Sequence, residues 1–393
     1  MRDTVIVAAT RTAVGKAPRG SLATVRPDDM AGAVVAGIMK NTGLDASLVD
    51  DLILGCAFPE GEAGLNMARQ VVFLGGLNKE TTAMTLNRYC SSGLEAVHLA
   101  TLKVGSGVAD CILAGGSESM SLIPMGGAQY RPNAKLAHDY ADSYLNMGLT
   151  AERVAEQEDI SREDQDAFAL QSHQRAAAAI EAGRFKDEIT PLNFDLTKPS
   201  GKGGKIGSRE VTFDTDEGPR ADSNAAALAK LRPVFKQGGT VTAGNSSQMS
   251  DGAAVLMVCD AEFAKAQGLK PIARLVSYAV AGNEPELMGL GPIYAVPKVL
   301  KQAGLSLGDM DIIELNEAFA AQGLAVMRKL DMNPEITNVN GGAIAMGHPL
   351  GCTGAKLSTQ ALYELGRRGG RYAMVTMCVG GGMGAAGIFE NLQ

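Results

Sequence analysis

The 393-residue chain lacks the features that mark several broad classes of protein. It has no long run of basic residues, and its net charge of −7 comes from 36 Lys and Arg against 43 Asp and Glu. We therefore expect no surface for nucleic acid or for an anionic membrane. No stretch is apolar enough to span a bilayer, and the N-terminus has no long apolar signal core, so a cytoplasmic protein is expected.

The chain also lacks the residue spacings of metal sites and redox motifs. None of its six cysteines forms a C-x-x-C pair, and its four histidines are scattered. We therefore predict no metal site, and reduced thiols indicate the cytosol. Three of the histidines have no distinctive setting and are interpreted as structural: His98 and His173, predicted in helices, and His138, predicted in a polar loop.

What the chain does contain is an ordinary globular composition and an internal repeat. A hydrophobic share of 46% and a length of 393 residues suggest two or three soluble domains. Residues 40–55 are similar to 301–316 at an offset of 261, Cys90 matches Cys352 at 262, and 107–113 matches 370–376 at 263. Because each part alternates strands and helices, we predict an α/β fold built from two related halves.

The repeat has no counterpart between about residues 120 and 242. This stretch holds an amphipathic, charged helix predicted at 161–182 and a Gly/Lys-rich tract, KPSGKGGK, at 198–205. The tract could meet phosphates, but a solvated hairpin tip is the better interpretation. We predict an inserted loop domain at 120–242, with one core half formed by 1–119 and 243–268 and the other by 269–393.

Two cysteines stand in glycine-rich turns. Cys90 lies in NRYCSSG at 87–93, between a strand-like run and a predicted helix, so its sulfur lies near a helix N-terminus that favours a thiolate. Cys378 follows the apolar strand 372–377 and precedes VGGGMG at 379–384, whose backbone N–H groups suit an oxyanion. For both cysteines the alternative is a buried apolar role.

Two further polar residues occupy comparable positions. His348 lies in a glycine-dense segment, 341–354, that we predict as a loop, and it could act as base to a cysteine or as an oxyanion donor. Asn316 follows the strand 312–315, at the strand end where α/β sheets build their sites. It could hold a water, donate to an oxyanion, or cap the next helix. Together with the two cysteines, these residues indicate acyl transfer through a thioester.

Four segments resemble the motifs of the thiolase family, in the family's order and along essentially the whole chain. They are NRYCSSG at 87–93, NEAFA at 316–320, GGAIAMGHPLG at 341–351 and CVGGGMG at 378–384. The resemblance implies a duplicated, five-layered α-β-α-β-α core with an inserted loop domain. It also implies coenzyme A thioesters as substrates, no tightly bound cofactor, and a homotetramer or at least a homodimer.

The resemblance further implies a role for each matching residue. Cys90 would be the acylated nucleophile and Cys378 the acid and base at C2 of the substrate. His348 would activate Cys90 and, with a water on Asn316, bind the thioester oxygen. The backbone N–H groups of Cys90 and Gly380 would form a second oxyanion hole.

Other positions bear on the ligand and the subtype. Arg220 and Ser247 match residues that contact coenzyme A in the family, near the adenine and the pantetheine respectively. The chain has NMG at 146–148 where acetoacetyl-CoA-forming members usually have HMG. Cys352 also favours a degradative member, but more weakly. The resemblance is therefore closest to degradative 3-ketoacyl-CoA thiolases of fatty acid β-oxidation. A biosynthetic acetoacetyl-CoA thiolase is the first alternative, and a non-catalytic acyl-CoA or lipid carrier is the second.

Overall fold

The first part of the chain forms a mixed sheet. The structure is a computed structural model that describes residues 1–200 and 205–393, and at 197–200 and 205–206 it describes the backbone alone. The strands of this sheet are β1 (Thr4–Arg11), β2 (Gly15–Lys16), β3 (Asp51–Gly55), β4 (Thr82–Leu86), β5 (Cys111–Ser119) and β8 (Ser250–Asp260). Its helices are α1 (Pro27–Thr42), α2 (Met67–Leu74), α3 (Ser92–Gly105) and α8 (Ala261–Ala266). The order β4-β3-β5-β8-β1 places β5 and β8 inside the sheet, and every residue of these two strands is buried.

The last part of the chain forms a second sheet of the same kind. Its strands are β9 (Ala273–Gly282), β10 (Ile312–Leu315), β11 (Tyr372–Val379) and β12 (Met383–Asn391), in the order β10-β11-β12-β9. Its helices are α9 (Gly291–Ala303), α10 (Ala320–Leu330), α11 (Ala343–Met346) and α12 (Leu350–Arg368). The two sheets join at β1 and β9 through a single pair, Ile6 with Ala273.

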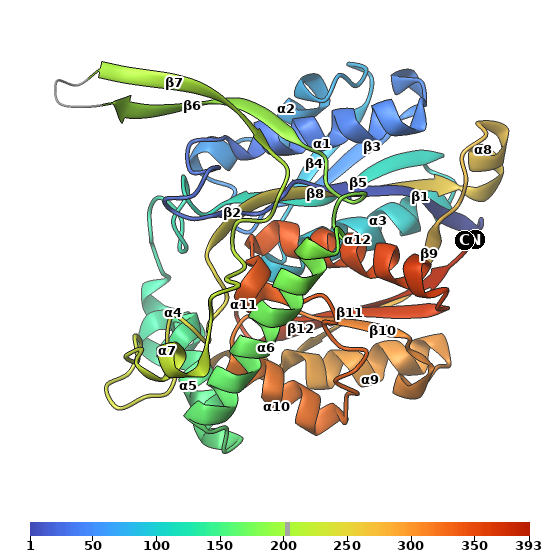
Figure 1. Ribbon diagram of the computed structural model, residues 1–393. Helices are drawn as coiled ribbons and strands as arrows, with labels where there is room; N and C mark the ends of the chain where they lie inside the picture. Colours follow the sequence, from blue (N-terminus) through green and yellow to red (C-terminus); the bar gives the residue numbers. More distant parts are fainter. Residues whose placement is uncertain (201–204) are drawn as a thin grey trace.

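Five layers result from this arrangement (Figure 1). Helices α1 and α2 cover the outer face of the first sheet, α3 and α12 lie between the sheets, and α9 and α10 cover the outer face of the second. A separate cluster of buried apolar side chains fills each region: between α1, α2 and the first sheet, between the two sheets, and between the second sheet and α9. The predicted five-layered α/β fold is confirmed.

Strand pairing shows the duplication directly. In each half the first strand pairs antiparallel with the last, the last pairs antiparallel with a central strand, and that strand pairs parallel with the next one out. Asp51 pairs with Ile112 in the first half and Ile312 with Ala373 in the second, so both partners are 261 residues apart. The sequence-based offset of 263 for the β5 and β11 region is therefore wrong.

The crossing of α3 and α12 follows the same spacing. A Cβ on Gly93 would lie 2.7 Å from the Ala355 nitrogen, and a Cβ on Gly354 would collide with the Leu94 nitrogen. Gly354 and Ala355 are the residues that follow Gly93 and Leu94 at an offset of 261, so the two contacts are equivalent. The same offset makes Gly351, and not Cys352, the counterpart of Cys90. Glycine is required at both crossing positions because the two helix backbones touch there.

The insertion leaves the first sheet after β5, and the chain returns to that sheet at β8. It contains α4 (Ala134–Asp139), α5 (Met147–Gln157), α6 (Arg162–Glu181), α7 (Ala225–Ala229), β6 (Leu192–Ser200) and β7 (Lys205–Phe213). The predicted helix at 161–182 is confirmed as α6, and Ser161 caps it by accepting from the Asp164 N–H at 3.0 Å. His138 lies in α4 and not in a loop. The domain boundaries themselves stay a prediction.

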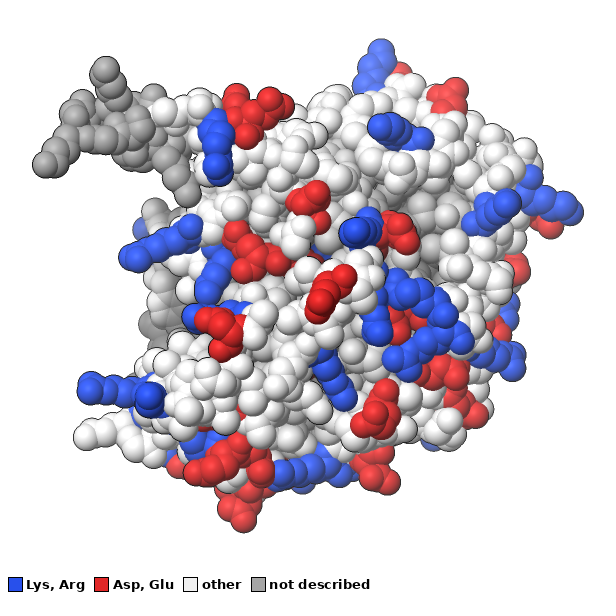
Figure 2. All heavy atoms as spheres, viewed as in Figure 1, with Lys and Arg blue, Asp and Glu red and all other residues white. Residues whose placement is uncertain are grey.

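Strands β6 and β7 form an antiparallel hairpin that projects from the body of the molecule (Figure 1). The Gly/Lys-rich tract, which could meet phosphates, has its central part, 201–204, outside the described residues. On the face shown in Figure 2, acidic and basic side chains are interspersed. Among the described residues, no helix has the length and hydropathy needed to cross a bilayer.

Candidate active site

Cys90 is presented by a strained turn between β4 and α3. It is the middle residue of a 3₁₀ turn, Tyr89–Ser91, that leads directly into α3. Tyr89 has a φ of 43°, a left-handed conformation that costs a non-glycine residue roughly 1–2 kcal/mol. Asn87 Oδ1 accepts from the Tyr89 N–H at 2.7 Å, and the Ser92 hydroxyl donates to the Tyr89 carbonyl at 2.7 Å. These contacts hold the turn, and Cys90 lies half-buried at the wall of a cavity.

Two backbone N–H groups, that of Cys90 itself and that of Gly380 in the turn between β11 and β12, act to lower the pKa of the Cys90 thiol. Burial raises the pKa of Cys90 to about 11, because these two hydrogen bonds offset only part of the desolvation, and buried Glu118 adds to the rise. The expected thiolate at the helix N-terminus is therefore wrong for the resting protein. At neutral pH the sulfur carries its proton.

His348 is buried just before α12, and both of its ring nitrogens have a partner. Nδ1 lies 2.6 Å from Thr353 Oγ1, and Nε2 lies 3.4 Å from Asn316 Nδ2. The His348 N–H donates to the Gln248 carbonyl at 3.1 Å, which fixes the backbone. Burial, with a smaller effect from the charge of Lys356, lowers the pKa of His348 to about 3. The imidazole is therefore neutral in the resting protein.

The segment that contains His348 is more regular than the predicted loop. The short helix α11 forms inside 341–354, and α12 begins at Leu350. Between them Gly347 has a φ of 91°, and a Cβ there would lie 2.9 Å from the Val14 side chain. The glycines of this segment permit close backbone packing between two helices.

Asn316 is fully buried at the end of β10, where its N–H donates to the Thr376 carbonyl at 2.9 Å. Its Oδ1 has no hydrogen-bond partner, which is rare for a buried amide oxygen and leaves it available to a water or a ligand. Helix α10 begins only at Ala320, with Phe319 at the N-cap position. The alternative role of Asn316 as a helix cap is therefore wrong.

Cys378 lies inside β11 and not after its end, paired with Gly384 of β12. It is buried in an apolar cluster with Met288 and Phe319. Burial raises the pKa of Cys378 well above the usual range, and the closeness of Cys90 raises it further. The structure thus places Cys378 close to Cys90 and His348 against Asn316, and each of the four was singled out from the sequence.

Two family models together match nearly the whole chain. They are "Thiolase, N-terminal domain", over residues 4–262, and "Thiolase, C-terminal domain", over residues 269–391. The chain belongs to the thiolase family. The resemblance read from the four motifs is confirmed, and acyl transfer is the class of reaction that the family catalyses.

Named relatives fall into two groups. A 3-ketoacyl-CoA thiolase of Bacillus subtilis is 52% identical, and the match covers 99% of this chain and 100% of the relative. An acetyl-CoA acetyltransferase of Pseudomonas aeruginosa is 48% identical, with 98% of each chain covered. The crystal structure of the Bacillus anthracis acetyl-CoA acetyltransferase superposes with a TM-score of 0.89 at 41% identity, covering 100% of this chain and 99% of that one.

Buried carboxylates brace this thiolase site, and sequence reasoning missed them. Glu118 accepts from the Ala57 N–H at 2.7 Å and from the Gly351 N–H, in the first turn of α12, at 2.8 Å. Glu317 accepts from the Ser172 hydroxyl at 2.6 Å and from Asn338 Nδ2 at 2.9 Å. Glu317 could have been suspected from its place beside Asn316 in the NEAFA motif, whereas the partners of Glu118 are too distant in sequence to be inferred.

The two residues matched to coenzyme A contacts, Arg220 and Ser247, are each held by a backbone hydrogen bond. The Ser247 N–H donates to the Ala318 carbonyl at 2.9 Å, next to the NEAFA turn. The Arg220 N–H donates to Nδ1 of buried His173 at 3.2 Å, while its guanidinium is exposed and lies 3.8 Å from Asp222. His173 is thus a structural acceptor, as expected.

A cavity of about 550 Å³ opens beside Cys90 and Gly380. Large apolar side chains line much of it: Phe58, Met125, Tyr130, Tyr144, Met147 and Leu350. Asn146 also lines the cavity, and its Oδ1 caps α5 by accepting from the Gly148 N–H at 2.9 Å. The cavity therefore has room and apolar surface for an acyl chain next to the reactive sulfur.

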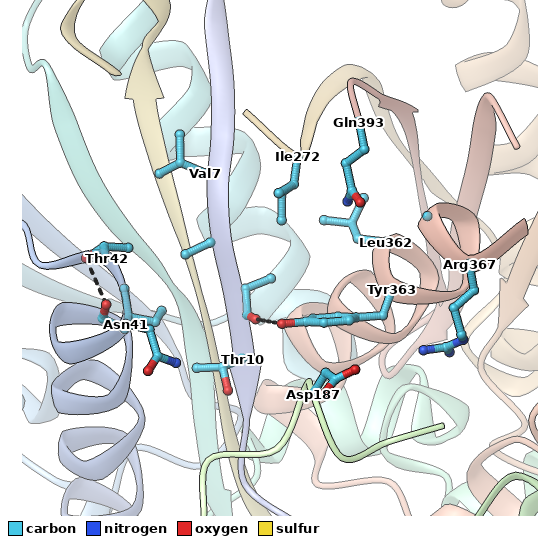
Figure 3. A pocket seen from close by; sticks show the side chains of 14 residues that line it. Val7, Thr10, Asn41, Thr42, Asp187, Ile272, Leu362, Tyr363, Arg367 and Gln393 are labelled. Atoms are coloured by element: carbon cyan, nitrogen blue, oxygen red, sulfur yellow. Dashed lines mark hydrogen bonds between the residues drawn. The ribbon is translucent and has the colours of Figure 1, made fainter. Parts of the chain in front are cut away.

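A second cavity, of about 520 Å³, lies at the seam between the sheets, beside β1 and the ends of α1 and α12 (Figure 3). Tyr363 crosses it and donates to the Ala9 carbonyl at 3.2 Å. None of the residues predicted for the site lines this cavity. Within the described residues, no three His, Cys, Asp or Glu side chains are grouped as a metal ion would require.

Proposed function

We propose that this thiolase cleaves 3-ketoacyl-CoA with coenzyme A, giving acetyl-CoA and a shortened acyl-CoA through an acyl group on Cys90. The observation that carries the proposal is the setting of Cys90, which lines a cavity together with Gly380 and lies close to a second cysteine, Cys378, while a buried histidine, His348, is paired with Asn316. A carrier that only binds acyl-CoA needs none of these groups. The non-catalytic alternative is therefore disfavoured.

In the first step the Cys90 sulfur attacks the C3 carbonyl of the substrate while His348 Nε2 accepts the thiol proton. The N–H groups of Cys90 and Gly380 stabilise the negative oxygen that forms. When the bond between C2 and C3 breaks, its electron pair passes to the acetyl-CoA enolate. His348 and a water on Asn316 stabilise the enolate oxygen, and Cys378 donates its proton to C2.

In the second step the acyl group leaves Cys90. The thiol of coenzyme A gives its proton to the Cys378 thiolate and attacks the acyl thioester, so Cys90 departs and is reprotonated by His348. Both cysteines and the histidine are then restored. Arg220 and Ser247 are proposed to contact the coenzyme A, and the enzyme is proposed to be a cytoplasmic homotetramer or homodimer.

The preference for degradation rests on the cavity and on Asn146. Asn146 is smaller than histidine and is engaged as a helix cap, so it leaves the cavity beside Cys90 open. The names of the relatives include both 3-ketoacyl-CoA thiolase and acetyl-CoA acetyltransferase, so they favour neither direction.

We expect thiolytic kcat/KM to be higher for medium-chain 3-ketoacyl-CoA than for acetoacetyl-CoA. Each methylene buried in an apolar pocket contributes about 0.8 kcal/mol, so two more carbons favour kcat/KM by roughly tenfold until the cavity is full. Rates on substrates of increasing length, in one buffer, measure this. If acetoacetyl-CoA is the best substrate and longer chains are inert, the biosynthetic alternative replaces the degradative one.

Two variants at one position separate size from helix capping. Asn146→His adds bulk at the cavity wall and removes the cap, and it should shift the preference toward acetoacetyl-CoA. Asn146→Ala removes the cap without adding bulk, so it should retain the preference for longer chains. A similar shift in both variants would mean that the cap, and not the size of the side chain, sets the preference.

Cys378→Ser should slow proton exchange at C2 without preventing acylation. A serine hydroxyl is a far weaker acid than a thiol, so exchange of the α-protons of acetyl-CoA with D₂O should fall by orders of magnitude. Cys90 should still accept an acyl group from a simple acyl-CoA. Exchange by NMR and acylation by mass spectrometry test the two halves of this prediction, and exchange at the wild-type rate would remove Cys378 from the mechanism.

A further inference from the structure

We propose that Thr353 is a positioning residue that holds His348 with its proton on Nδ1, so that Nε2 is the unprotonated nitrogen that accepts the proton of Cys90. The inference rests on the proposed function, because it assigns a second residue to the activation of the same nucleophile. Thr353 belongs to none of the roles inferred from the motifs, although it lies only five residues after His348.

The geometry around His348 distinguishes its two ring nitrogens. A neutral imidazole has one donor nitrogen and one acceptor nitrogen. Asn316 presents its Nδ2, which can only donate, 3.4 Å from Nε2, so Nε2 is the acceptor. Nδ1 must then carry the proton, and it donates a hydrogen bond to the Thr353 oxygen at 2.6 Å.

Thr353 is held firmly enough to orient the ring. Its side chain is completely buried in the first turns of α12, and a β-branched side chain in a helix has few rotamers. The same turns are fixed on both sides, since the Gly351 N–H donates to Glu118 and Gly354 packs against Leu94 of α3. The hydroxyl position is thus set by the packing of the two central helices.

The contact matters most after proton transfer. When Nε2 takes the proton of Cys90, the imidazole becomes a cation in a buried setting that disfavours charge, as the low pKa of His348 shows. The hydrogen bond from Nδ1 to Thr353 then becomes charge-assisted and roughly twice as strong as a neutral one. Thr353 therefore stabilises the charged state more than the resting state, which lowers the barrier to thiolate formation.

The test removes only the hydroxyl. Thr353→Val should lower thiolytic kcat by roughly ten- to a hundredfold with little change in KM, the range for a hydrogen bond to a charged group. Thr353→Ser keeps the hydroxyl and should restore most of kcat. Thr359→Val is the matched control, because Thr359 is a buried threonine on the same helix whose hydroxyl donates to the Ala355 carbonyl at 3.0 Å, away from His348.

A second readout does not depend on the substrate. Alkylation of Cys90 by iodoacetamide at neutral pH, followed by peptide mass spectrometry, should slow in Thr353→Val and recover in Thr353→Ser. Thr353→Ala serves in place of valine if the added methyl disturbs the helix in a melting experiment. Wild-type kcat and alkylation rate in the hydroxyl-free variants would overturn the proposal.

The two proposals fail in different ways. If the wild-type enzyme cleaves no 3-ketoacyl-CoA, the proposed function is wrong, and the alkylation rates still decide whether Thr353 acts on Cys90. If the wild type is active and Thr353→Val matches Thr359→Val in both readouts, only the role of Thr353 is wrong.

Discussion

Cys90→Ala should lose nearly all thiolytic turnover while the protein keeps its fold. Loss of the nucleophile in a covalent enzyme costs several orders of magnitude in kcat, because binding energy alone cannot replace a bond-forming group. The side chain is half-buried at a cavity wall, so removal of its sulfur leaves the core packing unchanged. Turnover in a coupled assay and circular dichroism of the same sample measure both expectations.

The wild-type enzyme supplies the complementary observation. Incubation with a 3-ketoacyl-CoA in the absence of free coenzyme A should add one acyl mass to the peptide that contains Cys90. Cys259→Ala is a suitable control, because this thiol is buried in the first sheet beside Cys111 and should not affect the adduct. An adduct found only on Cys378 would reverse the roles of the two cysteines.

Arg11→Met should destabilise the protein by about 3–5 kcal/mol, the usual cost of removing one partner from a buried ion pair. Arg11 is 1% exposed and donates to both oxygens of Asp216, at 2.8 and 2.9 Å, and to Glu188 at 2.8 Å. Its replacement leaves two buried carboxylates without their cation. Because Asp216 and Glu188 both belong to the insertion, the thermal and urea transitions should show the insertion loosening first.

A surface arginine provides the matched control. Arg274 pairs with Glu390 at 2.6 Å, but its side chain is 43% exposed. Glu390 keeps a second arginine, Arg371 at 3.0 Å, and a partly exposed pair contributes about 0–1 kcal/mol, so Arg274→Met should change the unfolding midpoint little. Equal losses in the two variants would show that the burial of Arg11 does not determine its contribution.

Sequence reasoning could name candidate site residues but not their electrostatics. Cys90, His348, Asn316 and Cys378 stand in motifs or at strand ends, which are local features of the chain. The charge state of Cys90 was predicted wrongly because a helix N-terminus favours a thiolate by only about 0.3–1 kcal/mol, whereas burial shifts a pKa by several units. Burial depends on the whole fold and cannot be read from seven residues.

The repeat was found from the sequence, but its register was not. Similarity between the halves is weak, so the sequence match shifts from an offset of 261 residues to 263 at the second central strand. Hydrogen-bonded register removes this freedom, since a shift of one residue would turn every side chain of a strand to its other face. The partner of His348 was missed for a related reason: the motif gives Thr353 its place in sequence but not its direction in α12.

The constant spacing of the two halves defines a counterpart for every reactive group. These counterparts are Gly351 for Cys90, Asn87 for His348, Gly55 for Asn316 and Ser117 for Cys378. A Cβ at Gly55 would lie 2.5 Å from Ser92, and one at Gly351 would lie 2.7 Å from Ala57. The place equivalent to the reactive centre is therefore filled by backbone.

The backbone fold of the two halves is therefore symmetric, whereas the reactive side chains are not. The first sheet supplies the sulfur that is proposed to carry the acyl group, and the second supplies the groups proposed to move its protons. One centre results from two halves, and its dimensions depend on how closely α3 and α12 approach each other. Because glycine is required at that crossing, any side chain added there would push the two halves apart and change the dimensions of the centre.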